Sequence, residues 1–166
     1  MKTLLLFRHA KSDWDADFDH DHDRPLNKRG KRSAKQMGSY LAAVGSLPGR
    51  VVTSSAARAV KTIELAAAAG GWNCEVAVEE SLYEADPEHI LSLIQEQSEP
   101  LDTLLLAGHE PAFSATTSLL IGGGSVRMPT AAIACIEFDA ERWSDVKAPD
   151  GRLVWLVTPK LLEQQG

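Results

Sequence analysis

The chain has few cysteines, few aromatic residues and no long apolar run. Its two cysteines, Cys74 and Cys135, stand far apart in 166 residues, and neither belongs to a CxxC pair. That number is too small for a disulfide framework or a cysteine-based zinc site, so we expect buried, reduced thiols. No window approaches the roughly 18 apolar residues that span a bilayer, and the apolar run at the N-terminus is too short for a signal peptide. These features predict a cytoplasmic protein that does not bind membranes.

An excess of basic charge is also missing. The chain has 17 Lys and Arg against 23 Asp and Glu, a formal net charge of −6. This balance disfavours a nucleic acid or an anionic membrane as partner, because the overall field would repel both. Arginines placed beside reactive residues are therefore more informative than the total charge.

The hydrophobic pattern is typical of one α/β domain. With 44% hydrophobic and 24% charged residues, the composition is that of an ordinary globular protein, and no linker or repeat divides it. We predict a single domain over residues 1–166. Short apolar runs alternate with helical periodicity, which indicates a mostly parallel sheet. The predicted strands cover residues 3–7, 50–53, 75–78, 101–107, 131–138 and 152–158. The predicted helices cover 27–44, a segment capped by Ser54-Ser55 that runs to Gly70-Gly71, 87–96, and a segment from Pro111 to about Gly122.

Three of these strands end in residues that can do chemistry. Arg8-His9 follows the first strand, the segment from Ser54 to Arg58 follows the second, and Gly108-His109 follows the fourth. Ligands of open α/β sheets bind outside the carboxyl ends of the strands, where helix N-termini point N–H groups outward. We therefore expect these residues to converge.

The residue types at these ends suit phosphoryl transfer. A neutral imidazole at His9 can attack phosphorus, while Arg8 stabilises the equatorial oxygens and lowers the histidine pKa. Arg58 offers a planar fork of donors, and His109 can hold a further oxygen. Taken singly, each has a plain alternative: a surface Arg-His pair, a helix-surface arginine, a structural histidine.

In combination, these motifs are more specific for a protein family than any one of them alone. RHAKS, SSxxRA and GHxP, in this order, resemble the histidine phosphatase superfamily. RPLNKRGKR (24–32), LYEA (82–85), PTAAI (129–133) and GRLVWLVTPK (151–160) are similar to its short bacterial branch, the SixA-type phosphohistidine phosphatases. The resemblance implies a phosphoglycerate mutase-like three-layer sandwich. It also implies that His9 is phosphorylated in a pocket of Arg8, Arg58 and His109, with no metal and no cofactor.

Three further residues are candidates for the site. The superfamily often has RHG followed by a pocket Asn, whereas this chain has RHAKSDW, so Ser12 is a candidate hydroxyl donor to the substrate. Arg24 either contacts the substrate's phosphate or anchors its loop through an ion pair. Glu84 is the candidate acid that protonates the leaving group, because in many members such an acid follows the helix begun by the second arginine. Glu80 and Asp86 compete with it for this role.

Two charged segments can each be interpreted as ordinary solvated surface or as a binding site. Asp13–Asp23 alternates Asp with His, but it lacks the glycine and terminal Glu of an EF-hand, so we predict a solvated loop without a metal. A basic run (Lys28, Arg29, Lys31, Arg32 and Lys35) is most simply a solvated helix face, and it could also guide an acidic partner.

These observations lead to a functional hypothesis. We expect a phosphatase that forms a phosphohistidine intermediate and dephosphorylates phosphohistidine on a signalling or phosphotransfer protein. The enzyme alternative is a small-molecule phosphomonoesterase. The alternative of another class is a phosphoprotein-binding module without turnover, which the presence of both arginines and both histidines disfavours. We expect a monomer.

Overall fold

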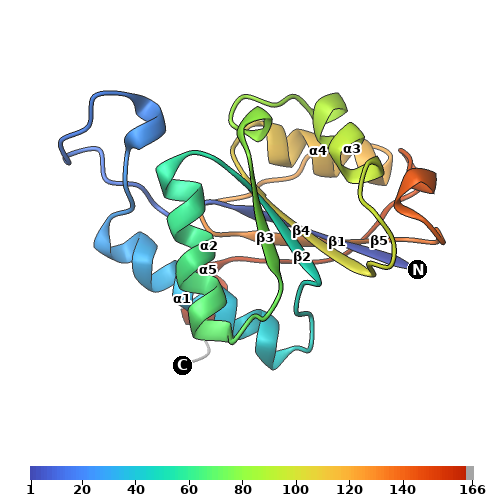
Figure 1. Cartoon of the computed structure of the whole chain (residues 1–166), viewed down its shortest axis with the longest axis horizontal. Coiled ribbons are helices and arrows are strands. Elements are labelled where there is room, and N and C mark those ends of the chain that lie inside the picture. Colours follow the sequence, from blue (N-terminus) through green and yellow to red (C-terminus); the bar gives the residue numbers. More distant parts are fainter. Residues whose placement is uncertain (164–166) are drawn as a thin grey trace.

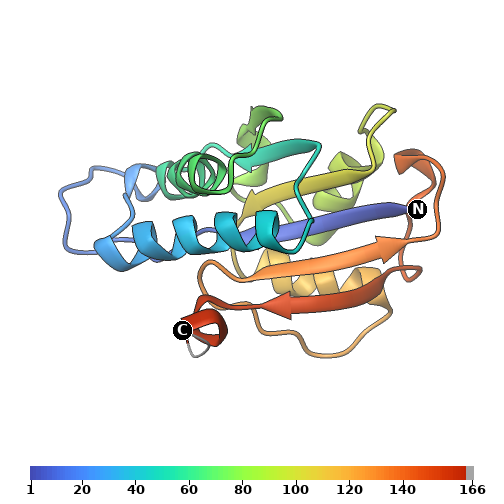
Figure 2. The ribbon, with the colours of Figure 1, turned by 90° about the horizontal axis from the view of Figure 1, so that it is seen from below.

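The computed structural model describes residues 1–163 as a six-stranded sheet between two layers of helices (Figures 1 and 2). The strands are β1 (Lys2–Arg8), β2 (Arg50–Ser54), β3 (Glu75–Glu79), β4 (Thr103–Gly108), β5 (Ile133–Phe138) and β6 (Arg152–Val157). The helices are α1 (Lys28–Ala43), α2 (Ala57–Gly70), α3 (Pro87–Gln95), α4 (Ala112–Ile121) and α5 (Pro159–Glu163). Helices α1, α2 and α5 cover one face of the sheet, and α3 and α4 cover the other. The predicted α/β class is confirmed.

The strand order in the sheet is β3-β2-β4-β1-β5-β6. The pairs β1–β4, β2–β4 and β2–β3 are parallel, as the alternation of strands and helices predicted. The pairs β1–β5 and β5–β6 are antiparallel, so the sheet is mixed. Strand β1 lies inside the sheet between β4 and β5, which explains its continuous apolar run.

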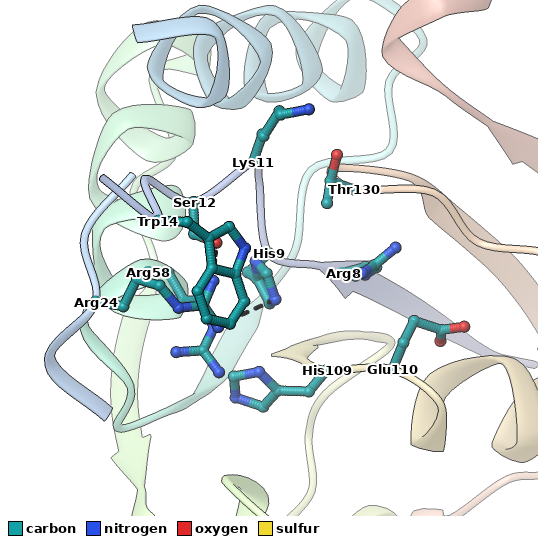
Figure 3. A pocket seen from close by; sticks show the side chains of 10 residues that line it. All are labelled: Arg8, His9, Lys11, Ser12, Trp14, Arg24, Arg58, His109, Glu110 and Thr130. Atoms are coloured by element: carbon teal, nitrogen blue, oxygen red, sulfur yellow. Dashed lines mark hydrogen bonds between the residues drawn. The ribbon is translucent and has the colours of Figure 1, made fainter. Parts of the chain in front are cut away.

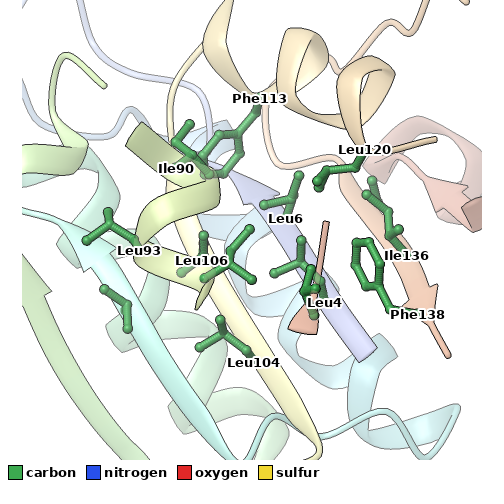
Figure 4. Close-up of a cluster of buried hydrophobic side chains, with 14 of the residues drawn as sticks. Leu4, Leu6, Ile90, Leu93, Leu104, Leu106, Phe113, Leu120, Ile136 and Phe138 are labelled. Carbon is green, nitrogen blue, oxygen red and sulfur yellow. The ribbon is translucent and has the colours of Figure 1, made fainter. Parts of the chain in front are cut away.

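The core has two halves, one on each face of the sheet. Leu4 and Leu6 point to the α3 and α4 side, together with Leu104, Leu106 and Phe113 (Figure 4). The intervening residues of β1 point to the α1 and α2 side, where they pack with Met37, Leu41 and Ile63. Because successive side chains of a strand alternate between faces, a strand covered on both faces must be apolar throughout.

Helices α1 and α2 approach each other through glycines. A Cβ on Gly38 would overlap the carbonyl oxygen of Ala66, and one on Gly70 would overlap the carbonyl of Gly38. The contact between the two helices therefore depends on positions without a side chain. It matters for the site because α2 carries Arg58.

Some local expectations were wrong. Helix α2 is not capped by Ser54 or Ser55: its N-cap is Ala56, which makes no side-chain cap, and Ser54 is the last residue of β2. Helix α5 was not predicted, because five residues are too few for a periodic signal. Cys135 is buried as expected, whereas Cys74 is only half-buried.

Among residues 1–163, no helix has both the length and the apolarity that crossing a membrane requires.

Candidate active site

The three predicted strand ends meet at one edge of the sheet. Arg8 lies opposite Gly108 in the β1–β4 register, and the backbone N–H of His9 donates to the Gly108 carbonyl at 3.0 Å. Strand β2 lies on the other side of β4 and brings the start of α2 to the same edge. A cavity of about 350 Å³ opens there (Figure 3). Its walls are formed by Arg8, His9, Lys11, Ser12, Trp14, Arg24, Arg58, His109, Glu110 and Thr130.

The contacts of His9 define where its ring carries a proton. Its Nδ1 lies 2.7 Å from the Ala10 carbonyl oxygen, which can only accept a hydrogen bond. Its Nε2 lies 3.4 Å from the Nε of Arg58, which can only donate (Figure 3). Both partners are satisfied when the proton is on Nδ1. The lone pair is then on Nε2, as an attacking nitrogen requires.

Burial keeps the His9 ring neutral. Only 7% of the residue is exposed. Burial, followed by the nearby His109, Arg58 and Arg8, lowers the pKa of His9 to about 3, against the hydrogen bond to Ala10, which raises it. The predicted effect of the neighbouring cations on this pKa is present, and burial contributes more than they do.

His109 faces His9 across the cavity. The two ring centroids are 5.2 Å apart, and His109 Nε2 lies 2.8 Å from the Ser54 hydroxyl. Burial, followed by the charge of Arg58, lowers the pKa of His109 to about 4. Its Nδ1 is buried and has no hydrogen-bond partner within residues 1–163. Ser54, predicted as a helix cap, instead orients this ring.

Arg58 lies in the cavity wall, and its guanidinium binds Asp21. Nη2 contacts the Asp21 carboxylate at 3.0 Å, and Nη1 donates to the Asp21 carbonyl at 2.8 Å. The hydroxyl of Thr62, one turn further along α2, donates to the Arg58 carbonyl and accepts from the N–H of Ala10. The first turn of α2 is thus tied to the residue after His9.

Asp21 is a part of the site that the sequence did not indicate. Its carboxylate accepts from Tyr83 Oη at 2.5 Å, from Arg24 Nη2 at 2.9 Å and from Arg58. The hydrogen bond from Tyr83, followed by those from Arg24 and Arg58, holds the pKa of Asp21 well below its usual range. We predicted a solvated acidic loop, and this one residue of the loop instead binds both arginines. One Asp among the six of this loop gives no signal of such a role.

Arg24 and Ser12 contact each other at the cavity. Arg24 Nη1 donates to the Ser12 hydroxyl, and the guanidinium stacks on the Trp14 ring at 3.6 Å. Together with its ion pair to Asp21, these contacts make Arg24 a loop anchor, one of its two predicted roles. It also lines the cavity, so the second predicted role, contact with substrate, stays a prediction.

Arg8 is the third arginine in the wall of the cavity. Its Nη1 donates to the Met128 carbonyl at 2.9 Å, and burial lowers the pKa of its guanidinium. Its Nε, like the Nε of Arg24, is buried without a partner in residues 1–163. Since buried polar atoms are almost always paired, these donors and His109 Nδ1 mark the wall as suited to an oxyanion.

The predicted acid Glu84 lies beside this cavity and not in it. It is exposed and lines a neighbouring cavity together with Tyr83, His109 and Glu110. Glu110 lines both cavities, and its carboxylate accepts from the backbone N–H of Ser114 at 2.7 Å. A leaving group at His109 could therefore meet either carboxylate, and the role of Glu84 stays a prediction.

No cluster of three or more His, Cys, Asp or Glu side chains suited to a metal ion occurs within residues 1–163. The Asp13–Asp23 loop is held instead by backbone contacts at its two ends: the Asp13 N–H donates to the Pro25 carbonyl at 2.8 Å, and the Asn27 N–H donates to the Lys11 carbonyl at 3.0 Å. The expectation of chemistry without a metal remains a prediction.

The chain belongs to the histidine phosphatase superfamily. The family model for branch 1 of that superfamily matches residues 4–100. An uncharacterized protein of Mycobacterium leprae is 34% identical over 165 residues, which cover 92% of this chain and 99% of the relative. The class of enzyme is therefore a phosphatase.

Among solved structures, the chain is similar over almost its whole length to proteins of the SixA type. A structure from Agrobacterium tumefaciens, assigned as the phosphohistidine phosphatase SixA, is 28% identical and covers 95% of this chain and 98% of its own, with a TM-score of 0.80. The protein histidine phosphatase SixA complexed with tungstate shares the fold at a TM-score of 0.84 and 23% identity, over 96% and 99% of the two chains. The predicted phosphoglycerate mutase-like fold is confirmed.

Proposed function

We propose that this phosphatase hydrolyses phosphohistidine on a protein through a phosphorylated His9. The observation that carries the proposal is the state of His9: a buried, neutral imidazole with its proton on Nδ1 and its lone pair on Nε2, between two arginines and a second histidine. A nucleophile needs this state, and a purely structural histidine does not.

The reaction has two steps. His9 Nε2 attacks phosphorus, the bond from phosphorus to the substrate nitrogen breaks, and the departing imidazole takes up a proton from solvent. Water then attacks the phosphoryl group on His9, the phosphorus–Nε2 bond breaks, and inorganic phosphate leaves. Arg8, Arg58 and His109 stabilise the equatorial oxygens in both transition states. Because Asp21 holds the fork of Arg58, phosphoryl oxygens must replace its carboxylate or share the donors with it.

Two observations favour a protein substrate over a small phosphate ester. The Agrobacterium structure, 28% identical over almost the whole chain, is assigned as a phosphohistidine phosphatase. Trp14, which lines the cavity, is 69% exposed, and its ring rests on Arg24. A rigid aromatic side chain exposed beside a catalytic cavity is well suited to pack against a protein surface.

The direct test is to trap the intermediate. The enzyme is mixed briefly with a chemically phosphorylated histidine peptide, quenched without acid, and digested for mass spectrometry. We expect phosphate on His9, labile in acid and stable in alkali, and no hydrolysis by the His9→Ala variant.

His20, an exposed histidine of the Asp13–Asp23 loop, provides the control. The His20→Ala variant should form the adduct as the wild type does. Phosphate on Ser12 or Ser54, or unchanged turnover by His9→Ala, would contradict the mechanism. Turnover of p-nitrophenyl phosphate with no turnover of phosphohistidine peptide would point to the small-molecule phosphomonoesterase.

A further inference from the structure

A second recess lies next to the catalytic cavity and carries a concentration of positive charge. It has a volume of about 440 Å³ and shares Lys11 and Thr130 with the catalytic cavity. Figure 3 shows these two residues on the side of the catalytic cavity away from His109, toward α1. The recess is lined by Lys11, Arg29, Ser33, Arg127, Pro129, Thr130, Thr158, Pro159 and Lys160. Its lining thus has four cations and three hydroxyls, and no carboxylate.

The four cations come from separate parts of the chain. Lys11 follows β1, Arg29 is in the first turn of α1, Arg127 precedes β5, and Lys160 is in α5. The sequence showed only the basic run on α1, because the other three cations are isolated in it. Folding places them around one recess in a protein whose net charge is −6.

These cations differ from the arginines of the catalytic cavity. Arg24 and Arg58 are each 6% exposed, and both pair with the carboxylate of Asp21. Arg8 is half-buried and donates to the Met128 carbonyl. The four side chains of the recess are all exposed, and none forms an ion pair with a carboxylate of residues 1–163. Buried, fixed arginines suit one phosphoryl group held in one geometry. Exposed, flexible cations suit several carboxylates, and they affect association and orientation more than chemistry.

We propose that this recess is a docking site for an acidic segment next to the phosphohistidine of the protein substrate. The inference rests on the proposed function and adds to it a substrate class: phosphohistidine flanked by Asp or Glu. Elsewhere the acidic enzyme repels an acidic partner, so attraction at the recess also fixes the orientation in which the partner approaches.

The test compares two synthetic peptides with one chemically phosphorylated histidine, flanked by Glu in one and by Gln in the other. Phosphate release should give the wild type a kcat/KM about tenfold higher for the Glu peptide at low ionic strength, mainly through KM. The preference should shrink in high salt, because the cations are exposed. In the double variant Arg29→Ser/Lys160→Ser it should fall to within about twofold, which is the range expected without specific attraction. Neither residue belongs to the catalytic cavity.

The control removes an equal kind of charge far from the recess. Lys147 belongs to the loop between β5 and β6. Figure 2 shows this loop at the end of the sheet where the N-terminus lies. Lys147→Ser should keep the preference, and all variants should hydrolyse p-nitrophenyl phosphate at the wild-type rate. Equal rates for both peptides in the wild type, or a preference that survives in the double variant, would overturn the proposal.

The two proposals fail in different ways. If p-nitrophenyl phosphate is hydrolysed and neither peptide is, the proposed function is wrong. Docking is then decided by binding of the unphosphorylated Glu peptide, followed by shifts of the backbone amide resonances of Thr130 and Thr158. Shifts that disappear in Arg29→Ser/Lys160→Ser support the docking site, and an absence of shifts overturns it.

Discussion

Arg58 contacts both the nucleophile and a carboxylate of the same chain. Its Nε donates to His9 Nε2, while both of its Nη atoms bind Asp21. The Asp21 carboxylate thus occupies donors that a phosphoryl group also requires. A dianionic phosphoryl group carries more charge than a carboxylate, so it has the advantage at the same arginine fork. Asp21 can in this way keep Arg58 and Arg24 in place without preventing substrate binding.

Replacing Arg58 by Lys should be far from conservative. Lysine keeps the charge but loses the planar fork, so it cannot contact His9 and hold two oxygens at once. We expect kcat to fall roughly ten- to thousand-fold, as for removal of one positioned donor, with a smaller change in KM. Steady-state kinetics with p-nitrophenyl phosphate measure both. Arg152→Lys, at an exposed arginine paired with Asp139, is the control and should change neither constant. A near-normal kcat in Arg58→Lys would show that Arg58 only recruits substrate.

Substrates with different leaving groups can test whether Glu84 is the general acid. If Glu84 protonates a departing alkoxide, Glu84→Gln should slow sugar phosphates by about 10²-fold, the usual scale of general acid catalysis. It should scarcely affect p-nitrophenyl phosphate, whose phenolate leaves readily, or phosphohistidine, whose imidazole leaves once protonated. Turnover of all three substrates is compared with that of Glu110→Gln, since Glu110 lines both cavities. Equal slowing of all three substrates in Glu84→Gln would mean that Glu84 supports the fold, and selective slowing in Glu110→Gln would identify Glu110 as the acid.

At the scale of elements, the site depends on how α2 is placed. Helix α2 packs on α1 through glycines, and its Thr62 hydroxyl binds the backbone of Ala10 next to His9. The distance between the two helices therefore determines where Arg58 lies relative to His9. The sequence pattern predicted α1 by the helical spacing of its apolar residues, and α2 by the residues that flank its Ala-rich segment. It could not predict the close contact, since a glycine inside a helix gives no periodic signal.

Gly38→Ala tests this contact. The new methyl group would overlap the Ala66 carbonyl, which belongs to helix backbone and cannot move alone. We expect the free energy of unfolding to fall by roughly 1–3 kcal/mol, the usual cost of overpacking, despite alanine's higher helix propensity. Lys35→Ala, at an exposed position of α1, should change it by less than about 0.5 kcal/mol. Urea denaturation measures both variants. A Gly38→Ala protein as stable as the wild type would mean that the helices can separate without loss.

At the scale of the whole molecule, the sequence predicted the site better than its surroundings. The strand ends carrying His9, Arg58 and His109 were predicted to converge, because parallel strands place their carboxyl ends at one edge. Asp21 and the basic recess were not predicted. The Asp21 contacts and the recess each bring together residues that are distant in the chain. Taken alone, each of these residues is interpreted as an ordinary solvated side chain. The sequence also did not predict that β5 is antiparallel to β1, since the residues of β5 are as apolar as those of a parallel strand.

The two buried histidines should make the whole molecule acid-labile. Their pKa values are lowered from 6.5 to about 3 for His9 and about 4 for His109, mainly by burial. Between these values and 6.5 the unfolded chain binds protons that the folded chain does not, so stability is present above pH 6.5 and is lost as the pH falls. Each histidine should contribute a slope of about 1.4 kcal/mol per pH unit over that range.

Urea denaturation at a series of pH values between 7 and 4.5 measures this slope, in a range above the ordinary pKa of aspartate and glutamate side chains. We expect His9→Gln and His109→Gln each to flatten the curve by up to one histidine's contribution, because glutamine has no proton to gain on unfolding. Ser98→Ala, at an exposed position without a titratable group, should leave the curve parallel to that of the wild type. If the wild-type curve were flat, the folded protein would have to accept protons on both rings. His9 would then lose the neutral state on which its role as nucleophile depends.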